Sequence, residues 1–171
     1  MIYKLTAMWL GMALILTTMP GCVGYRLGST LPPDVKAIYV SLFINKCNEP
    51  LLEIDTTNAT IAEFQNDGTL RIVPKEDADV ILETTLTSMT LTPLRYDQTV
   101  DSTKPNEYRM TLHVSFVLKR AKTMEIMNEA SVIGEATFEY LGNLNSSKRT
   151  AIPPASADLA KRIVEKVVET W

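Results

Sequence analysis

Few residues of this 171-residue chain could make or break bonds. The chain has one histidine, His113, and two cysteines, Cys22 and Cys47. A catalytic Ser/His/Asp or Cys/His arrangement would have to use His113, and a zinc site needs several Cys, His or carboxylate ligands. Glu135 and Glu139, two positions of one parity on a predicted strand, are the remaining pair for acid–base work. We therefore predict no catalytic residues, no metal site and no cofactor, with a glycan hydrolase using this glutamate pair as an alternative.

Cys22 follows a segment typical of export. Lys4 supplies one positive charge, and the fifteen residues 5–19 contain none. This apolar run suits a signal peptide and is shorter than the roughly 20 residues that a membrane-spanning helix needs. It ends in Met19-Pro20-Gly21-Cys22, which resembles the lipobox of bacterial lipoproteins, whose cysteine is acylated and becomes the N-terminus. The lipobox prefers Leu at the first of these positions and Ser or Ala at the second.

We therefore predict that residues 1–21 are a lipoprotein signal peptide and residues 22–35 a tether lipidated at Cys22. An ordinary signal peptide with Cys22 as a structural thiol, and a retained membrane anchor, are the alternatives. With Cys22 acylated, Cys47 has no disulfide partner within the chain and is predicted to be a buried, inert thiol.

The rest of the chain, residues 36–171, has the length of a single domain. The net charge of the whole chain is −3 at pH 7, so general binding to nucleic acid is not expected.

Patterns of apolar residues predict the strands and helices of this domain. Strands are expected over residues 36–45, 69–74, 80–92, 108–119 and 129–140. The first has Ile38, Val40, Leu42 and Ile44 on one face and apolar Tyr39 and Phe43 on the other, so both faces should be covered, as in a central strand. A β-bulge near Thr87 or Ser88 should keep the third in register. Residues 93–107 and 141–154 are expected to be irregular.

Two helices complete the prediction. The first is expected from a cap at Asn48 to about Asn66, ended by Gly68, with a buried stripe of Leu51, Ile54, Ala59, Ala62 and Phe64. The second is expected to begin at a Ser156 cap and to bury Leu159, Ile163, Val164, Val167, Val168 and Trp171. The predicted fold is α+β, a two-layer sandwich with two helices on one face of a mixed, mostly antiparallel sheet of four to five strands. The other face would be partly polar, with Arg109, Thr111, a solvated His113, Glu135 and Thr137.

Several segments together resemble the LptE family of lipopolysaccharide-assembly lipoproteins. They are Gly24-Tyr25-Arg26-Leu27 directly after the cysteine, the strand at 38–45, Asp67-Gly68-Thr69-Leu70, Ala78-Asp79 and Tyr108-Arg109. The chain departs from the family pattern at Ser41-Leu42 and at Asn45-Lys46-Cys47, as a distant member would.

The resemblance implies a non-catalytic lipoprotein on the periplasmic side of the outer membrane. It would plug and support the assembly of an LptD-like β-barrel and contact lipopolysaccharide through basic residues. Basic residues at strand ends are the candidates: Arg95, Lys119, Arg120 and Lys122. Each could instead be a solvated turn residue. Another accessory lipoprotein, such as a cell-wall synthase activator or a secretion component, is the alternative function.

Overall fold

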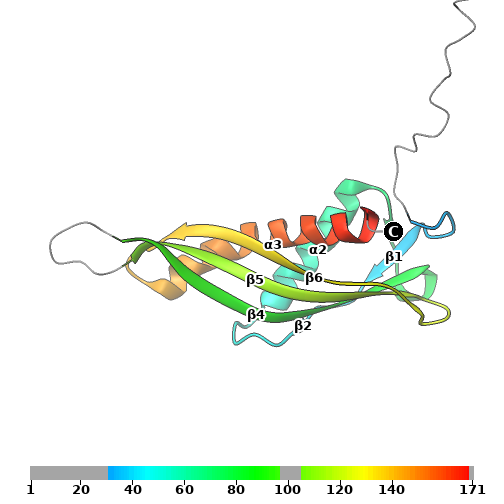
Figure 1. Cartoon of the computed structure of the whole chain (residues 1–171), viewed down its shortest axis with the longest axis horizontal. Helices are drawn as coiled ribbons and strands as arrows, with labels where there is room; N and C mark the ends of the chain where they lie inside the picture. Colours follow the sequence, from blue (N-terminus) through cyan, green and yellow to red (C-terminus); the bar gives the residue numbers. More distant parts are fainter. Residues whose placement is uncertain (1–30, 97–104, 170–171) are drawn as a thin grey trace, which may run out of the picture.

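The computed structural model of the chain describes residues 31–96 and 105–169. Three long antiparallel strands form most of the sheet (Figure 1): β4 (Val80–Tyr96), β5 (Pro105–Arg120) and β6 (Ile126–Glu139). The expected alternation holds along β5, where Met110, Leu112, Val114, Phe116 and Leu118 are buried. These side chains form the floor of the hydrophobic core.

Three short strands extend the sheet beside β4. They are β1 (Ala37–Val40), β2 (Ile44–Asn45) and β3 (Arg71–Ile72). The order is β3-β1-β4-β5-β6, with β2 also paired to β4, and all pairings of these short strands are parallel. A 3₁₀ turn, η1 (Lys75–Asp77), precedes β4. The sheet is mixed and mostly antiparallel as predicted, but it has six strands because the first predicted strand is divided.

The division of that strand reverses which of its side chains are buried. Ser41 donates its N–H to the Leu82 carbonyl, and the Phe43 N–H turns to the Thr57 hydroxyl. Phe43 is therefore buried, whereas Leu42 and Ile44 are 60% and 58% exposed. The predicted burial of Leu42 and Ile44 was wrong because the break between β1 and β2 changes the alternation.

The predicted bulge in β4 is confirmed. The register shifts between Leu86 and Ser88, after which Met89 and Leu91 pair with the core-facing residues of β5. The expected irregular segment 93–107 is shorter than predicted, because β4 continues to Tyr96 and β5 begins at Pro105. Pro93 is tolerated because β2 no longer pairs with this part of β4, which is an edge of the sheet.

Helix α2 (Leu52–Asp67) begins later than predicted. Asn48 is not its cap; the residue before the helix is Leu51, in a left-handed conformation with φ 68° and no capping bond. The predicted end at Gly68 is confirmed, since this glycine has φ 73° and its N–H reaches the Phe64 carbonyl.

The buried face of α2 also differs from the prediction. Leu51 and Ile54 are exposed, and of the expected stripe only Phe64 is buried. The remaining buried residues are Leu52, Thr56, Thr57 and Thr60. The hydroxyls of Thr56 and Thr60 donate to backbone carbonyls four residues earlier, which satisfies their polar groups inside the core.

Helix α3 (Leu144–Glu169) begins twelve residues before the expected cap. Its cap is Asn143, whose side-chain oxygen accepts the N–H groups of Asn145 and Ser146. The segment 141–154 is therefore largely helical, and Pro153 and Pro154 lie inside the helix with exposed side chains. Ser156 is buried in mid-helix, and its hydroxyl has no hydrogen-bond partner within residues 31–96 and 105–169.

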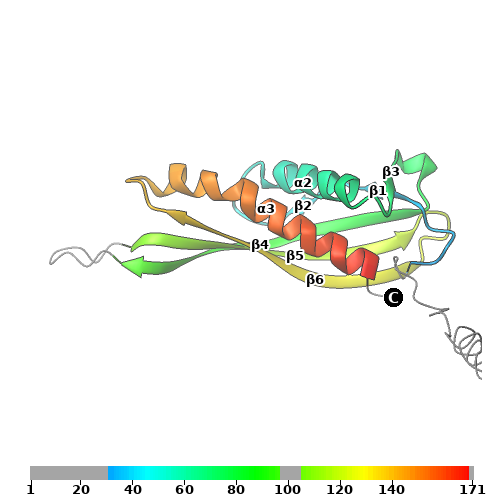
Figure 2. The ribbon, with the colours of Figure 1, turned by 90° about the horizontal axis from the view of Figure 1, so that it is seen from above.

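Both helices lie on one side of the sheet, as Figure 2 shows. The stripe Leu159, Ile163, Val164, Val167 and Val168 is buried as predicted; Trp171 falls outside the described residues. At Gly134 of β6 the helix comes so close that a Cβ would lie 2.4 Å from the Leu159 Cβ. Asp158 of α3 accepts the outward N–H of Glu135 at the edge of β6.

Candidate functional site

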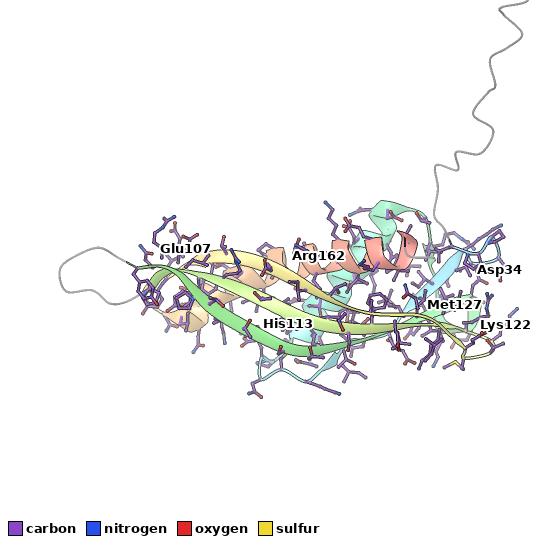
Figure 3. The ribbon with its side chains drawn as sticks, viewed as in Figure 1. Asp34, Glu107, His113, Lys122, Met127 and Arg162 are labelled. Atoms are coloured by element: carbon purple, nitrogen blue, oxygen red, sulfur yellow. The ribbon has the colours of Figure 1, made fainter. Side chains whose placement is uncertain are left out.

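The four predicted lipopolysaccharide contacts lie at two opposite ends of the sheet. Lys119 pairs in register with Ile81 at the start of β4, and Arg95 lies near the end of the same strand. Fourteen residues separate these two positions of β4, which corresponds to about 45 Å of strand. Figure 3 shows Asp34 and Lys122 at one end and Glu107, the neighbour of Arg95, at the other. The structure therefore brings Lys119, Arg120 and Lys122 together and leaves Arg95 apart.

Two of the three clustered cations already have carboxylate partners. The Lys119 Nζ lies 2.6 Å from the Glu83 Oε2, and the Arg120 Nη1 lies 2.5 Å from the Asp34 Oδ2. The hydrogen bond from Arg120, joined by a backbone hydrogen bond, holds the pKa of Asp34 below its ordinary value. Lys122, in the turn between β5 and β6, is exposed and forms no ion pair within the described part of the chain. Lys122 is thus the most available of these cations.

Arg95 lies on the surface at the distal end. Its Nη2 is 3.4 Å from the Glu107 Oε2, and its side chain is 73% exposed. A shallow pocket of about 230 Å³ beside it is also lined by Asn106, Glu139 and Tyr140. Two carboxylates near one arginine leave little net positive charge here for a phosphate group.

The face of the sheet away from the helices is rich in hydroxyl groups. Across the register, Thr90 lies beside Thr111 and Glu135, and Thr92 lies beside Arg109 and Thr137. The Thr111 hydroxyl is 3.2 Å from the Glu135 Oε1. This outer face, defined by these six residues with His113, is partly polar, as predicted.

A groove of about 470 Å³ is lined by His113 of β5 together with residues of β6 and α3. Its lining includes Thr87, Ser131 and Ile133 from the sheet and Arg162, Glu165 and Lys166 from α3. Figure 3 shows His113 on the outer face and Arg162 on α3 beyond β6. Sequence reasoning missed this combination, because the contacts of α3 with the edge of β6 depend on where the helix begins.

The geometry of Glu135 and Glu139 does not suit glycoside hydrolysis. Four residues of strand separate them, which is about 13 Å. Paired carboxylates in glycosidases are about 5 to 9.5 Å apart, and Glu135 is engaged with Thr111. Within residues 31–96 and 105–169, no group of three or more His, Cys, Asp or Glu side chains could hold a metal ion.

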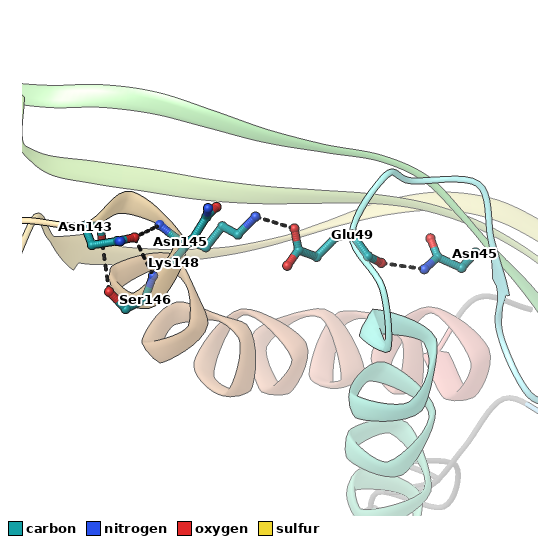
Figure 4. Close-up of polar contacts among 6 residues, drawn as sticks. All are labelled: Asn45, Glu49, Asn143, Asn145, Ser146 and Lys148. Carbon is teal, nitrogen blue, oxygen red and sulfur yellow. Dashed lines mark hydrogen bonds and ion pairs between the residues drawn. The ribbon is translucent and has the colours of Figure 1, made fainter.

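A polar cluster fastens the loop after β2 to the first turns of α3 (Figure 4). The Asn45 side-chain amide donates to the Glu49 carbonyl oxygen at 2.8 Å, and the Glu49 carboxylate accepts from the Lys148 Nζ at 2.5 Å. Both ionic side chains are largely buried, so each needs the other. Cys47 in the same loop is half-buried, and burial raises the pKa of its thiol.

Cys22, the predicted site of lipidation, lies outside the described residues. No helix within the described part of the chain is long and apolar enough to cross a membrane. The predicted signal peptide, tether and acylation therefore stay predictions.

Comparison with protein families gives the decisive match. The model of the family LptE, described as lipopolysaccharide-assembly, matches residues 35–167. The chain belongs to the LptE family. The match covers the described domain from the start of β1 nearly to the end of α3, so it applies to the whole fold.

Solved structures with the same fold are distant in sequence. PelC from Paraburkholderia phytofirmans, a dodecamer, is 14% identical with a TM-score of 0.52, over 84% of this chain and 94% of that one. A minor lipoprotein from Acinetobacter baumannii is 11% identical with a TM-score of 0.51, over 78% and 92%. Protein XCC0632 from Xanthomonas campestris is 8% identical with a TM-score of 0.52, over 80% and 88%. No curated protein sequence matches the chain. At these identities the likeness shows the fold alone.

Proposed function

We propose that this LptE-family chain is a non-catalytic lipoprotein of the outer membrane, anchored on the periplasmic side through lipid on Cys22. In this proposal it plugs and supports the assembly of an LptD-like β-barrel in a lipopolysaccharide translocon and contacts lipopolysaccharide. The observation that carries the proposal is the family match over residues 35–167.

The outer face of the sheet supports the plug role. A wide outer-membrane barrel has a polar, water-filled interior. The threonines along β4, β5 and β6 can exchange hydrogen bonds with water or with a polar wall. Arg109 and Glu135 on the same face would need polar or oppositely charged groups of the wall as partners.

The lipopolysaccharide contact is proposed for the cluster Lys119, Arg120 and Lys122, with Arg95, whose charge Glu107 and Glu139 partly offset, as a separate and weaker second contact. Phosphate groups attract Lys and Arg through charge-assisted hydrogen bonds. Lys122 has no ion-pair partner within the described residues and can make such bonds directly, whereas Arg120 would exchange Asp34 for the phosphate.

Co-purification from outer membranes tests the barrel partner. Full-length protein with a C-terminal tag should bring down a stoichiometric large β-barrel protein. Thr90→Arg combined with Thr137→Arg adds two charges to the outer face and should abolish this co-purification. Gln65→Arg with Asn66→Arg, at exposed positions of α2, adds the same charge and should not.

Two results would refute the proposal. Recovery of a cell-wall synthase or a secretion component in place of a barrel would favour the alternative accessory lipoprotein. Retention of the barrel by the outer-face variant would show that this face is not the one in contact.

A further inference from the structure

The turn between β5 and β6 is fixed beside the point where the chain enters the domain. Asp34 is bound to Arg120, and Asp79 accepts the N–H groups of Lys36 and Ala37 while its carbonyl accepts that of Ala121. Figure 3 shows Asp34, Lys122 and Met127 at the same end of the molecule. An attachment of the chain before Asp34 therefore also determines where the β5–β6 turn lies.

The turn presents apolar side chains to solvent. Met124 is 50% exposed, and Ile126, at the start of β6, is 56% exposed. Lys122 adds a positive charge without an ion-pair partner among the described residues. Two apolar side chains beside a lysine are a combination that suits the interface between acyl chains and lipid headgroups.

Met124 is an unfavourable residue for its position. Its φ is 57°, a left-handed conformation that favours glycine or asparagine over a long side chain. The turn is closed by backbone bonds alone, from the Met124 N–H to the Arg120 carbonyl and from the Arg120 N–H to the Glu125 carbonyl. The turn therefore does not require a methionine, and strain at such a residue points to a role outside the fold.

The tether limits how far this end can lie from a membrane. Leu31, the first described residue, is nine positions after Cys22, and nine extended residue steps span at most about 30 Å. If Cys22 is acylated, as the proposed function holds, the Asp34 end is the end of the domain held near the bilayer. The opposite end of β4, with its exposed Leu94, lies roughly 45 Å farther along the strand.

We propose that the β5–β6 turn is a second membrane contact, in which Met124 and Ile126 enter the bilayer interface and Lys122 meets phospholipid headgroups. The inference rests on the proposed lipid anchor at Cys22 and not on the barrel partner. A membrane attachment made of two separate contacts is more stable than either contact alone. The tether keeps the turn at high effective concentration near the surface, so a contact of two side chains is sufficient.

Depth-dependent fluorescence quenching of the full-length lipoprotein tests the contact. The protein is reconstituted into vesicles of phosphatidylethanolamine and phosphatidylglycerol that carry a quencher on their acyl chains. An environment-sensitive label is placed at Met124→Cys or, as matched control, at Leu94→Cys, each with Cys47→Ser. We expect strong quenching at position 124 and little at position 94, where a similarly exposed apolar residue lies at the far end.

The outcomes separate the inference from the anchor. Protein that floats with the vesicles but is unquenched at position 124, or equally quenched at both positions, overturns the turn contact and leaves the anchor intact. Protein that fails to float overturns both.

A glycine variant distinguishes a contact from a loss of folding. Met124→Gly relieves the left-handed strain and should raise the midpoint of thermal unfolding, while a label at Ile126→Cys loses most of its quenching. A lower midpoint together with unchanged quenching would contradict the proposal.

Discussion

At the scale of single residues, the ion pair between Arg120 and Asp34 makes a direct prediction. Because the Arg120 guanidinium lowers the pKa of Asp34, Arg120→Ala should raise the pKa of this carboxyl toward its ordinary value of 3.8. An NMR titration of the Asp34 carboxyl in both proteins measures the change. Arg149→Ala, which removes an exposed cation of α3, should leave the Asp34 pKa where it is.

The same pair makes stability depend on pH with a defined sign. A carboxyl whose pKa is lowered by folding contributes stability that is present above its unfolded pKa and lost as the pH falls through its folded pKa. Asp34 is lowered, so the stability difference between the parent and Arg120→Ala should be present at neutral pH and vanish in acid below that lowered pKa. A difference that persisted there would assign the effect to packing of the arginine stem.

At the scale of elements, the approach of α3 to β6 depends on Gly134. A Cβ at this position would lie 2.7 Å from both the Ala155 carbonyl oxygen and the Leu159 Cα, so backbone would have to move. Gly134→Ala should therefore destabilise the domain by about 2–3 kcal/mol, as overpacking does. Urea unfolding gives this value, and Ser131→Ala on the exposed side of the same strand should change stability by less than about 0.5 kcal/mol.

The elements that could be predicted are those with a clear period. The alternation in β5 and β6, the bulge after Leu86 and the stripe at the end of α3 all follow from side-chain spacing alone. The prediction that Leu42, Ile44, Leu51 and Ile54 are buried was wrong, because their burial depends on where β1 ends and where α2 begins. Those points are set by tertiary hydrogen bonds such as that from the Phe43 N–H to Thr57.

The start of α3 shows another limit of sequence reasoning. Residues 141–154 were predicted to be irregular, and two consecutive prolines normally end a helix. The Asn143 cap and the buried side chains of Ala151, Ile152 and Ala155 stabilise the helix across them. The ion pair of Lys148 with Glu49 holds the same turns against the loop after β2. These contacts offset the effect of the two prolines, and they depend on the tertiary structure, which the sequence alone does not show.

At the scale of the whole molecule, the predicted cationic contacts lie at two distant ends, so their effects on lipopolysaccharide binding can be measured separately. Arg120→Ala with Lys122→Ala should weaken lipopolysaccharide binding roughly tenfold, the effect of losing about 1.4 kcal/mol of charge-assisted hydrogen bonding. The fold should persist, since an ion pair exposed to solvent contributes little to stability. Arg149→Ala with Lys161→Ala, an equal loss of charge on α3, is the control.

Arg95→Ala supplies the complementary measurement. Because about 45 Å of strand separates it from Lys119, its effect on lipopolysaccharide binding should add to that of the double variant without coupling. Unchanged binding by the double variant would remove the Lys119 end from consideration. The sequence suggested the basic residues as candidates. It could not show that they lie at two opposite ends of the sheet, because that separation depends on the length of the β4–β5 hairpin.

The strand edges that pair with no other strand in the described part of the chain determine whether copies of the domain can associate with one another. An exposed strand edge is a template for aggregation. Here Pro93 removes a donor from the free part of β4, and Asp158 occupies the outward N–H of Glu135 on β6. Both features hinder one copy of the domain from pairing strand to strand with another through these edges.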